Sequence, residues 1–310
     1  MYANIKMVKK MNEDISILLK YGEELTTKEY ITNPAIARDY EIKRALLVLL
    51  TPEKSVILTG KPGIGKTAIV EGIANRIAKG DVPDALKKYR IVKVNTPALL
   101  GVENGESRVL ILMEELKKVE NVILFIDEIH TLIQQDAKSA LDLANMFKPG
   151  LDRGSIKVIG ATTTAEYETY ILRDKAFVRR FERVDVEEPS TEVTAEIMVG
   201  SMLKMEKKTG VKFDYPDYIK EKVCYFIANM TSEFKRVYEI GARYPDVSLA
   251  ILAKIFSYAL FDNKDKVNFQ HIYNAIKNTK SVYPDVIEKD LVIFKEEFKN
   301  ILDEEFVVMD

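Results

Sequence analysis

The stretch Val56-Ile57-Leu58-Thr59-Gly60-Lys61-Pro62-Gly63-Ile64-Gly65-Lys66-Thr67 decides the fold of this chain. An apolar run leads into a loop with the spacing G-x-x-x-x-G-K-[ST], and a helix-patterned segment from Lys66 to Lys79 follows. Glycines let backbone N–H groups turn towards phosphate oxygens, a helix start favours an anion, and a lysine reaches the terminal phosphates. The pattern therefore predicts a phosphate-binding loop, although an accidental glycine-rich turn is the alternative. Its residues are Gly60, Pro62, Gly63, Ile64, Gly65, Lys66, Thr67 and Ala68.

A second apolar run, Val122 to Ile126, ends in the acids Asp127 and Glu128. Ligands of open parallel sheets bind at the carboxyl ends of the strands, which brings these acids beside the phosphate loop. We expect the Thr67 hydroxyl and the Asp127 carboxylate to hold Mg²⁺, and Glu128 to activate the attacking water. The alternative is a solvated acidic strand end.

Composition narrows the class of protein. The 310 residues are 47% apolar and 30% charged, which suits two domains that share a cleft. A net charge of -2 gives no general reason to expect a nucleic acid or an anionic membrane as partner. A single cysteine, Cys224, excludes a disulfide framework and points to a reducing cytoplasm, and no run of 18 apolar residues predicts a membrane span. His130 and His271 are too few for a zinc site, so we interpret both as structural.

Strand-like and helix-like runs alternate up to about residue 188, which predicts an α/β core with a mainly parallel sheet. The strand-like runs are Val56–Leu58, Ile91–Val94, Val122–Ile126, Lys157–Ile159 and Val184–Val186. Only helical patterns follow, starting with a segment capped by Ser190 or Thr191 and ending with one from Val286 to Leu302. We predict a leader over 1–32, a large domain over 33–188, a helical domain over 189–280 and a helical extension over 281–310.

Many short segments match one family in order. They are Asn33-Pro34-Ala35-Ile36-Ala37-Arg38-Asp39, Gly60 to Thr67, Glu71-Gly72-Ile73-Ala74, Asp81-Val82-Pro83, Phe125 to Leu132, Asn145-Met146-Phe147-Lys148-Pro149, Gly160-Ala161-Thr162-Thr163, Glu166-Tyr167 and Arg179-Arg180-Phe181. Through them the chain resembles the AAA+ ATPases of the Clp type, specifically the first ATPase ring of ClpA, ClpB and ClpC. Ala37 stands where that family usually has glycine.

The resemblance implies a P-loop NTPase three-layer sandwich with a smaller helical lid, and hydrolysis of ATP with Mg²⁺. It implies that Ile36 and Ala37 bracket adenine and that Thr163 is the first sensor of the terminal phosphate. Arg179 and Arg180 would be arginine fingers that enter a neighbouring subunit's site, so a homo-oligomeric ring, with a hexamer as one option, is implied. A solvated basic turn is the alternative for the two arginines. Arg243, in Gly241-Ala242-Arg243, is either a second sensor that binds nucleotide or a helix-capping arginine.

The chain departs from the family where such rings grip polypeptide. The stretch from Gly101 to Arg108 looks shorter than the family's pore loop, and no aromatic residue occurs between Tyr89 and Phe125. The second pore segment, Ile133 to Lys138, is altered too. Aromatic side chains supply an apolar, stacking grip, so threading is in doubt while ATP hydrolysis is not.

Three functions therefore stay open at this point. The first is a ring-forming ATPase that remodels an unidentified protein substrate. The second is a nucleotide-gated adaptor or scaffold that pulls on nothing. The third, a DNA-linked loader, is disfavoured by the near-neutral charge.

Overall fold

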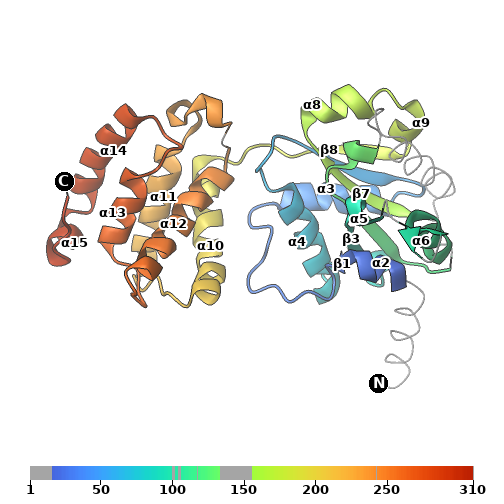
Figure 1. Ribbon diagram of the computed structural model, residues 1–310, viewed down its shortest axis with the longest axis horizontal. Coiled ribbons are helices and arrows are strands. Elements are labelled where there is room, and N and C mark those ends of the chain that lie inside the picture. The colour runs from blue at the N-terminus through green and yellow to red at the C-terminus, as the bar shows by residue number, and fades with distance from the viewer. Residues whose placement is uncertain are drawn as a thin grey trace, which may run out of the picture. The chain divides into compact units, whose positions relative to one another are not determined.

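The computed structural model describes residues 16–99, 102–103, 106–116, 118–132, 156–241 and 243–309. Contacts between residues divide the chain into two compact units (Figure 1). Of the described residues, unit 1 contains 16–30, 38–61 and 66–186, and unit 2 contains 31–37, 62–65 and 187–309. The main boundary, between Val186 and Glu187, lies close to the predicted end of the large domain. The segment 31–37 groups with unit 2, which differs from the prediction that the large domain starts at residue 33.

Unit 1 is built on a six-stranded sheet with the order β1-β3-β6-β7-β2-β8. All neighbours in it are parallel except β1, which pairs antiparallel with β3 at one edge. The strands are β1 (Gly22–Glu24), β2 (Ser55–Thr59), β3 (Arg90–Val94), β6 (Val122–Ile126), β7 (Lys157–Thr162) and β8 (Phe181–Asp185). A separate hairpin joins β4 (Val102–Glu103) to β5 (Glu106–Ser107).

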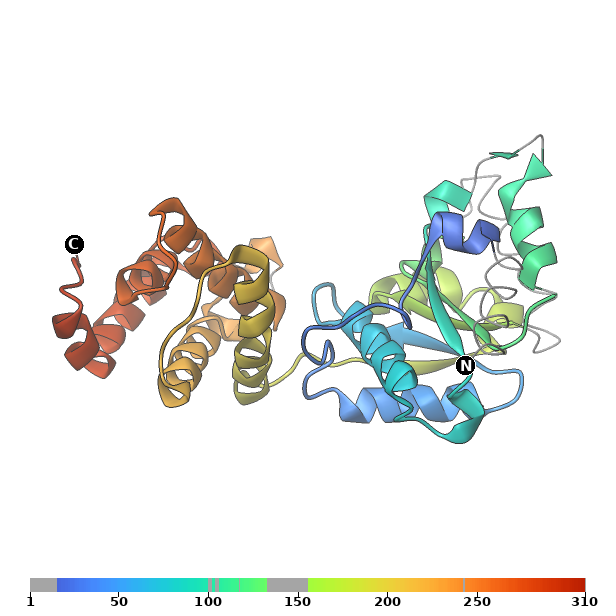
Figure 2. The same ribbon diagram turned by 90° about the horizontal axis from the view of Figure 1, so that it is seen from below.

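Helices lie around this sheet, as Figures 1 and 2 show. The longer ones, α3 (Asp39–Leu50) and α4 (Lys66–Lys79), pack on strands, and α2 (Ser16–Tyr21) packs beside α6 (Arg108–Leu116). Shorter helical segments are α5 (Thr96–Leu99), α8 (Thr164–Glu166), α9 (Lys175–Val178), the 3-10 turns Asp84–Leu86 and Ile129–Leu132, and the π turn Tyr167–Ile171. Because helices cover the sheet, every residue of β2 and β6 is buried. The mainly parallel α/β core is the one that the apolar runs predict.

The start of the described chain belongs to unit 1 rather than to a separate leader. In β1, Gly22 pairs with Val94 and Glu24 with Val92. Leu18 and Leu25 are each 1% exposed. Of the predicted leader over 1–32, residues 16–30 therefore pack as part of unit 1, which the sequence did not indicate because polar edge strands carry a weak hydrophobic pattern.

Unit 2 consists of helices and connecting loops after residue 190. They are α10 (Thr191–Thr209), α11 (Asp217–Met230), α12 (Asp246–Phe261), α13 (Phe269–Lys277), α14 (Pro284–Glu297) and α15 (Lys299–Glu304), with 3-10 turns at Glu233–Lys235 and Tyr238–Ile240. Ser190 caps α10, and its hydroxyl accepts a hydrogen bond from the Val193 amide. No described helix of either unit combines the length and the apolar character that a membrane span needs.

The last helices share the core of unit 2. The rings of Phe294 and Phe298 pack edge-to-face on Phe226 of α11 and at tilted angles on Phe269 of α13. The single helix predicted over Val286–Leu302 is interrupted at Phe298, a buried residue with non-helical backbone angles. Residues 281–310 were predicted to form an extension, but the described part of them, through 309, packs into the same core as the preceding helices.

Candidate nucleotide site

The phosphate loop runs between β2 and α4, as its sequence predicts. Gly63 and Gly65 adopt φ angles of 76° and 98°, which lie in the left-handed region that glycine tolerates. Ile64 between them is 1% exposed and anchors the loop. The helix α4 begins directly at Lys66, so the amides of Lys66, Thr67 and Ala68 are at its positive end.

Lys66 lies over this loop. Its ammonium donates hydrogen bonds to the carbonyl oxygens of Gly60, at 2.9 Å, and Lys61, at 3.0 Å. Burial lowers the pKa of Lys66, while the nearby carboxylates of Asp127, Glu166 and Glu128 act in the opposite direction. The Lys66 ammonium therefore lies at the phosphate loop, where it can contact a bound phosphate.

Thr67 and Asp127 meet as predicted. The Thr67 hydroxyl donates a hydrogen bond of 3.1 Å to Asp127 Oδ2. A hydroxyl and a carboxylate are the hard oxygen ligands that Mg²⁺ prefers, and Mg²⁺ commonly takes one or two carboxylates and completes its shell with phosphates and water. The described residues contain no cluster of three or more metal-ligating side chains. The donor set thus fits a Mg²⁺ ion that is bound together with phosphates.

Glu128 follows Asp127 with a strained backbone. Its φ of 52° is uncommon for a residue other than glycine, and its side chain is exposed. The next residue, Ile129, is fully buried against Gly160 of β7. The buried Ile129 therefore holds Glu128 where the chain turns away from the sheet.

Thr163 directly follows β7 and is part of a network that the sequence analysis did not predict. It caps α8: its hydroxyl accepts a hydrogen bond of 3.2 Å from the Glu166 amide, and its own amide donates to Glu166 Oε2 at 3.0 Å. The Thr162 hydroxyl donates to the same Oε2 at 3.0 Å, and His130 Nδ1 lies 3.2 Å from it. Burial acts to raise the pKa of Glu166, but these hydrogen bonds outweigh it and the pKa is lowered. The spacing Thr163-x-x-Glu166 is the sequence signature of this capping box, but it does not indicate that Thr162 and His130 also contact Glu166.

Arg179 and Arg180 lie at the amino-terminal ends of the strands, opposite the carboxyl ends where the acids lie. They precede Phe181, the first residue of β8, which pairs in parallel with Ser55 at the start of β2. The phosphate loop follows the far end of β2. The five residues of β2 separate its start from its end by about 16 Å. Arg179 is exposed, and Arg180 forms an ion pair of 3.3 Å with Glu53.

Ile36 and Ala37 belong to unit 2, where Ile36 contacts Gly200 of α10. Ala37 has a φ of 54°, the conformation that explains why the family usually has glycine there. Beside them, unit 2 contains a cavity of about 640 Å³ with a mostly apolar lining. Its wall is formed by Thr32, Asn33, Ile36, Glu192, Ala195, Glu196, Val199, Gly200, Glu221 and Tyr225, so three carboxyl groups lie beside the apolar side chains.

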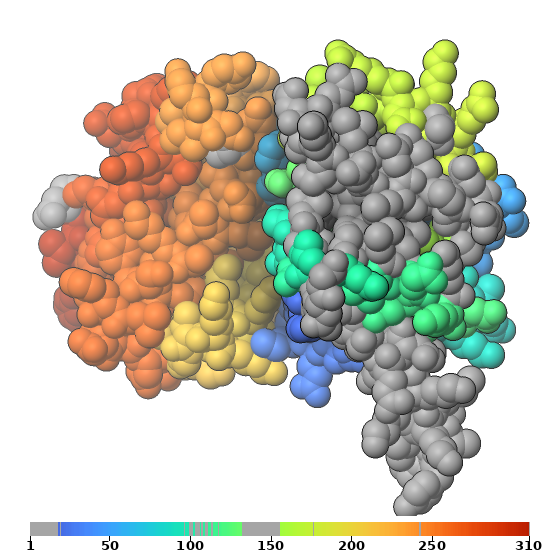
Figure 3. All heavy atoms as spheres, turned by 45° about the vertical axis from the view of Figure 1, so that its right-hand side comes forward, coloured from blue at the N-terminus to red at the C-terminus, as the bar shows by residue number. Residues whose placement is uncertain are grey.

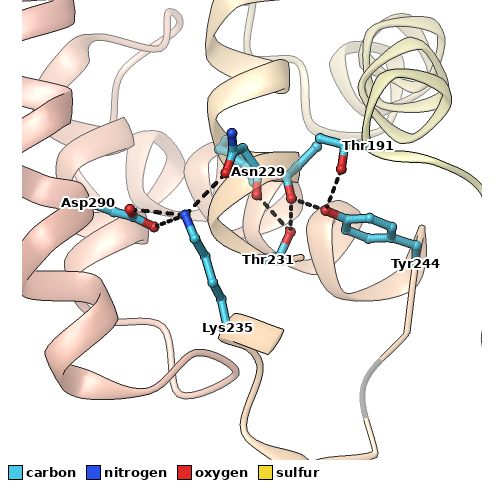
Figure 4. Close-up of polar contacts among 8 residues, drawn as sticks. Thr191, Asn229, Thr231, Lys235, Tyr244 and Asp290 are labelled. Atoms are coloured by element: carbon cyan, nitrogen blue, oxygen red, sulfur yellow. Dashed lines mark hydrogen bonds and ion pairs between the residues drawn. The ribbon is translucent and has the colours of Figure 1, made fainter. Parts of the chain in front are cut away.

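Arg243 lies at the start of α12, where its carbonyl oxygen accepts a hydrogen bond of 3.0 Å from the Val247 amide. The neighbouring Tyr244 is fixed by its hydroxyl, which donates to the Ala228 carbonyl and lies 3.5 Å from that of Thr191 (Figure 4). In the same view, the Lys235 ammonium lies 3.1 Å from both carboxylate oxygens of Asp290. The contacts of Tyr244 fix the residue next to Arg243, whose role as a second sensor stays a prediction.

Comparison with known proteins identifies this architecture. Residues 56–187 match the family model described as the ATPase family associated with various cellular activities (AAA). The chain is 44% identical over 211 residues to the chaperone protein ClpB of Meiothermus ruber. Its ATPase domain is of the Clp AAA+ type. The α/β fold class with its helical domain is thereby confirmed, and unit 1 carries a nucleotide-binding ATPase domain.

The similarity to Clp-type proteins extends to other relatives. A probable ATP-dependent Clp protease ATP-binding subunit of Chlamydia pneumoniae is 36% identical over 249 residues, which cover 78% of this chain and 28% of the relative. The alignment with the Meiothermus ClpB covers 65% and 25%. The chain thus spans about a quarter of the length of these curated relatives.

Among solved structures, those of Hsp104 are similar to this chain. A closed state with ATPγS and FITC casein superposes with a TM-score of 0.70 at 29% identity, over 91% of this chain and 49% of that one. An extended complex of Saccharomyces cerevisiae Hsp104 with casein gives 0.69 at 33% identity, over 81% and 42%.

The region where Clp-type rings carry the first pore loop forms the β4–β5 hairpin, in which Val102 pairs with Ser107 and Glu103 with Glu106. Figure 3 shows the described residues around this hairpin, drawn in teal to green, at the surface of unit 1. Val102 is 63% exposed and is the apolar residue of this hairpin. The second pore segment, Ile133–Lys138, and the match at Asn145–Pro149 lie outside the described residues.

Proposed function

We propose that this chain is an ATP-hydrolysing subunit of a homo-oligomeric ring that remodels a protein or a protein complex. The observation that carries the proposal is the placement of residues in unit 1. Lys66, Thr67, Asp127 and Glu128 gather at the carboxyl ends of the strands, whereas Arg179 lies at the opposite edge of the same sheet.

In this proposal the loop binds the phosphates of ATP. Backbone amides from Gly63 to Ala68 and the Lys66 ammonium bind their oxygens. Thr67 and Asp127 hold Mg²⁺, which supplies positive charge that offsets the phosphate oxygens when bound. Glu128 accepts a proton from the attacking water, for which its exposed position next to Asp127 is suited.

Other predicted residues assist this reaction. Thr163 responds to the terminal phosphate, because its hydroxyl proton remains available while its oxygen caps α8. Ile36 and Ala37 bracket the adenine base. Arg243 is proposed to respond to the bound nucleotide from unit 2.

Arg179 and Arg180 are proposed to act on a neighbouring subunit. About 16 Å of strand separates them from the phosphate loop that follows β2, which an arginine side chain of the same subunit does not span. A guanidinium that enters from a neighbour makes hydrolysis depend on assembly. Arg179 is the stronger candidate because Arg180 pairs with Glu53.

The test is the ATPase rate as a function of protein concentration, with the mass measured by light scattering in the same samples. Specific activity should rise with assembly, and Arg179→Ala should lose about 10³-fold in kcat without losing oligomers. Arg173→Ala, an exposed arginine in the preceding turn, is the matched control and should match the wild type. A flat rate from a monomer that ignores Arg179→Ala would refute the ring mechanism, and Glu128→Gln with full activity would refute the catalytic assignment.

A nucleotide-gated scaffold is the second candidate, and the β4–β5 hairpin favours it because this region carries no aromatic residue. Hsp104, a structural relative, is seen with casein, so a tagged, unfolded casein is a suitable probe of threading. ATP-driven unfolding or translocation of a tagged substrate would exclude the scaffold. The cytoplasmic location stays a prediction. The DNA-linked loader also stays a prediction, and salt-sensitive, ATP-dependent DNA binding would support it.

A further inference from the structure

Lys93 is a charged residue in a strand that is otherwise buried. In β3, Ile91, Val92 and Val94 are buried, while the Lys93 side chain is 36% exposed. Its partner in the parallel register is Phe125 of β6, two positions before Asp127. The register therefore brings this lysine to the edge of the sheet where the acids lie.

The ammonium of Lys93 contacts the proposed metal ligand. Lys93 Nζ lies 3.5 Å from Asp127 Oδ2, the oxygen that also accepts the hydrogen bond from Thr67. It also lies 5.6 Å from the centroid of the buried Phe125 ring, a cation–π contact that orients the side chain. Glu23, directly opposite Lys93 on β1, pairs with Lys28 at 2.9 Å instead.

We propose that Lys93 sets the metal dependence of nucleotide binding, because it offers a positive charge at the same carboxylate oxygen as Mg²⁺. When Mg²⁺ is scarce, the ammonium balances Asp127 and attracts the phosphates, so metal-free ATP still binds. When Mg²⁺ binds to Asp127, the ammonium repels it and raises the concentration of Mg²⁺ that is needed. The inference rests on the proposed function, in which Asp127 holds Mg²⁺.

The size of the effect follows from exposure. Both side chains are about one-third exposed, at 36% and 35%, so solvent screens the pair. Such pairs contribute up to about 1 kcal/mol, which corresponds to about a fivefold change in an equilibrium constant. The two effects have opposite signs, and a merely structural loss does not produce opposite signs.

The experiment uses the whole chain and a fluorescent N-methylanthraniloyl derivative of ATP. Its Kd is measured in excess EDTA, and the Mg²⁺ concentration that gives half of the metal-dependent change in affinity is measured separately. Lys93→Met should raise the Kd in EDTA about fivefold and lower the Mg²⁺ midpoint about fivefold. Lys93→Arg should restore both values, because it returns the charge. Lys157→Met, which removes a lysine from the other end of the same sheet, should leave both unchanged.

Asp127→Asn separates this inference from the proposed function. If Asp127→Asn removes the Mg²⁺ effect but Lys93→Met changes neither value, the role of Lys93 is overturned and that of Asp127 stands. If Asp127→Asn keeps the wild-type Mg²⁺ midpoint, the proposed metal site itself fails. Shifts of the same sign in both conditions for Lys93→Met, without rescue by arginine, would also overturn the inference.

Discussion

Gly160→Ala should impair both folding and catalysis, because Gly160 leaves room for Ile129. Gly160 is in the central strand β7, with Ile57 on one side and Ile126 on the other. A Cβ atom built on Gly160 would lie 2.7 Å from Ile129 Cδ1 and 3.0 Å from Ile129 Cγ2. Real Cβ contacts are longer, so Ile129 must move. Since Ile129 is fully buried, its displacement passes to the backbone of Glu128.

The magnitude follows from overpacking of a buried site. An extra methyl in a filled core costs about 1–3 kcal/mol, and we expect about 2 kcal/mol because both branches of Ile129 are close. A shift of about 1 Å in a catalytic group can cost about 10²-fold in rate. In Gly160→Ala, kcat should therefore fall by more than the loss of folded protein explains. The reason is that Glu128 is displaced in the molecules that do fold.

The assay is a double-mutant cycle. Urea denaturation and ATPase kinetics are measured for Gly160→Ala, Ile129→Val and the double variant. Ile129→Val alone should cost about 1 kcal/mol, and the double variant should be more stable than the sum of the two by about 1 kcal/mol or more. Strict additivity, or a Gly160→Ala variant with wild-type stability and rate, would refute the reasoning.

Three further variants or conditions test other contacts. Ala37→Gly should stabilise the protein by about 0.5 kcal/mol in thermal denaturation. An L-residue at φ 54° destabilises the folded state by about 1–2 kcal/mol, and the flexibility of glycine in the unfolded chain offsets part of the gain. A lower melting temperature would contradict this. Glu188→Ala should destabilise unit 2 by about 3 kcal/mol in urea, because it leaves the Arg236 guanidinium, 4% exposed, without its carboxylate at 2.5 Å, whereas the exposed Glu239→Ala should change little. Burial lowers the pKa of His271 below 6.5, despite Asp262 nearby, so the unfolded chain binds more protons and stability should fall as the pH drops below about 6.5. Urea denaturation at pH 7.5 and pH 5 checks this, and an unchanged slope in His271→Gln would count against it.

Local patterns predict the centre of unit 1 well. The buried parallel strands appear as apolar runs, and the predicted helix Lys66–Lys79 has the observed bounds. The phosphate loop is equally local, since glycine spacing fixes its backbone. The meeting of Thr67 with Asp127 follows from the rule that strand ends share one edge, which is why a distant pair could be predicted.

Features that depend on pairing across the chain are not predictable in this way. Short polar strands such as β1 have no hydrophobic pattern and form because β3 offers an edge. The helix predicted over Val286–Leu302 breaks at Phe298 because that ring turns into an aromatic core shared with α11 and α13. The contact of Lys93 with Asp127 needs the register between β3 and β6, although a lone lysine inside an apolar run was an available signal.

Hydrolysis of the nucleotide and binding of the nucleotide, the metal and the substrate depend on different residues of this chain. The residues proposed for hydrolysis, namely Lys66, Thr67, Asp127 and Glu128, lie at the carboxyl ends of β2 and β6, where the Thr67 hydroxyl donates a hydrogen bond to Asp127. Ala37 and Lys93 instead concern how nucleotide and metal are held, and the β4–β5 hairpin concerns how a substrate would be held. Substitutions at these binding positions alter the affinity for nucleotide and its dependence on Mg²⁺, while the residues proposed for hydrolysis stay in place. For this reason binding measurements, with and without Mg²⁺, separate the proposed mechanisms more sharply than a single ATPase rate.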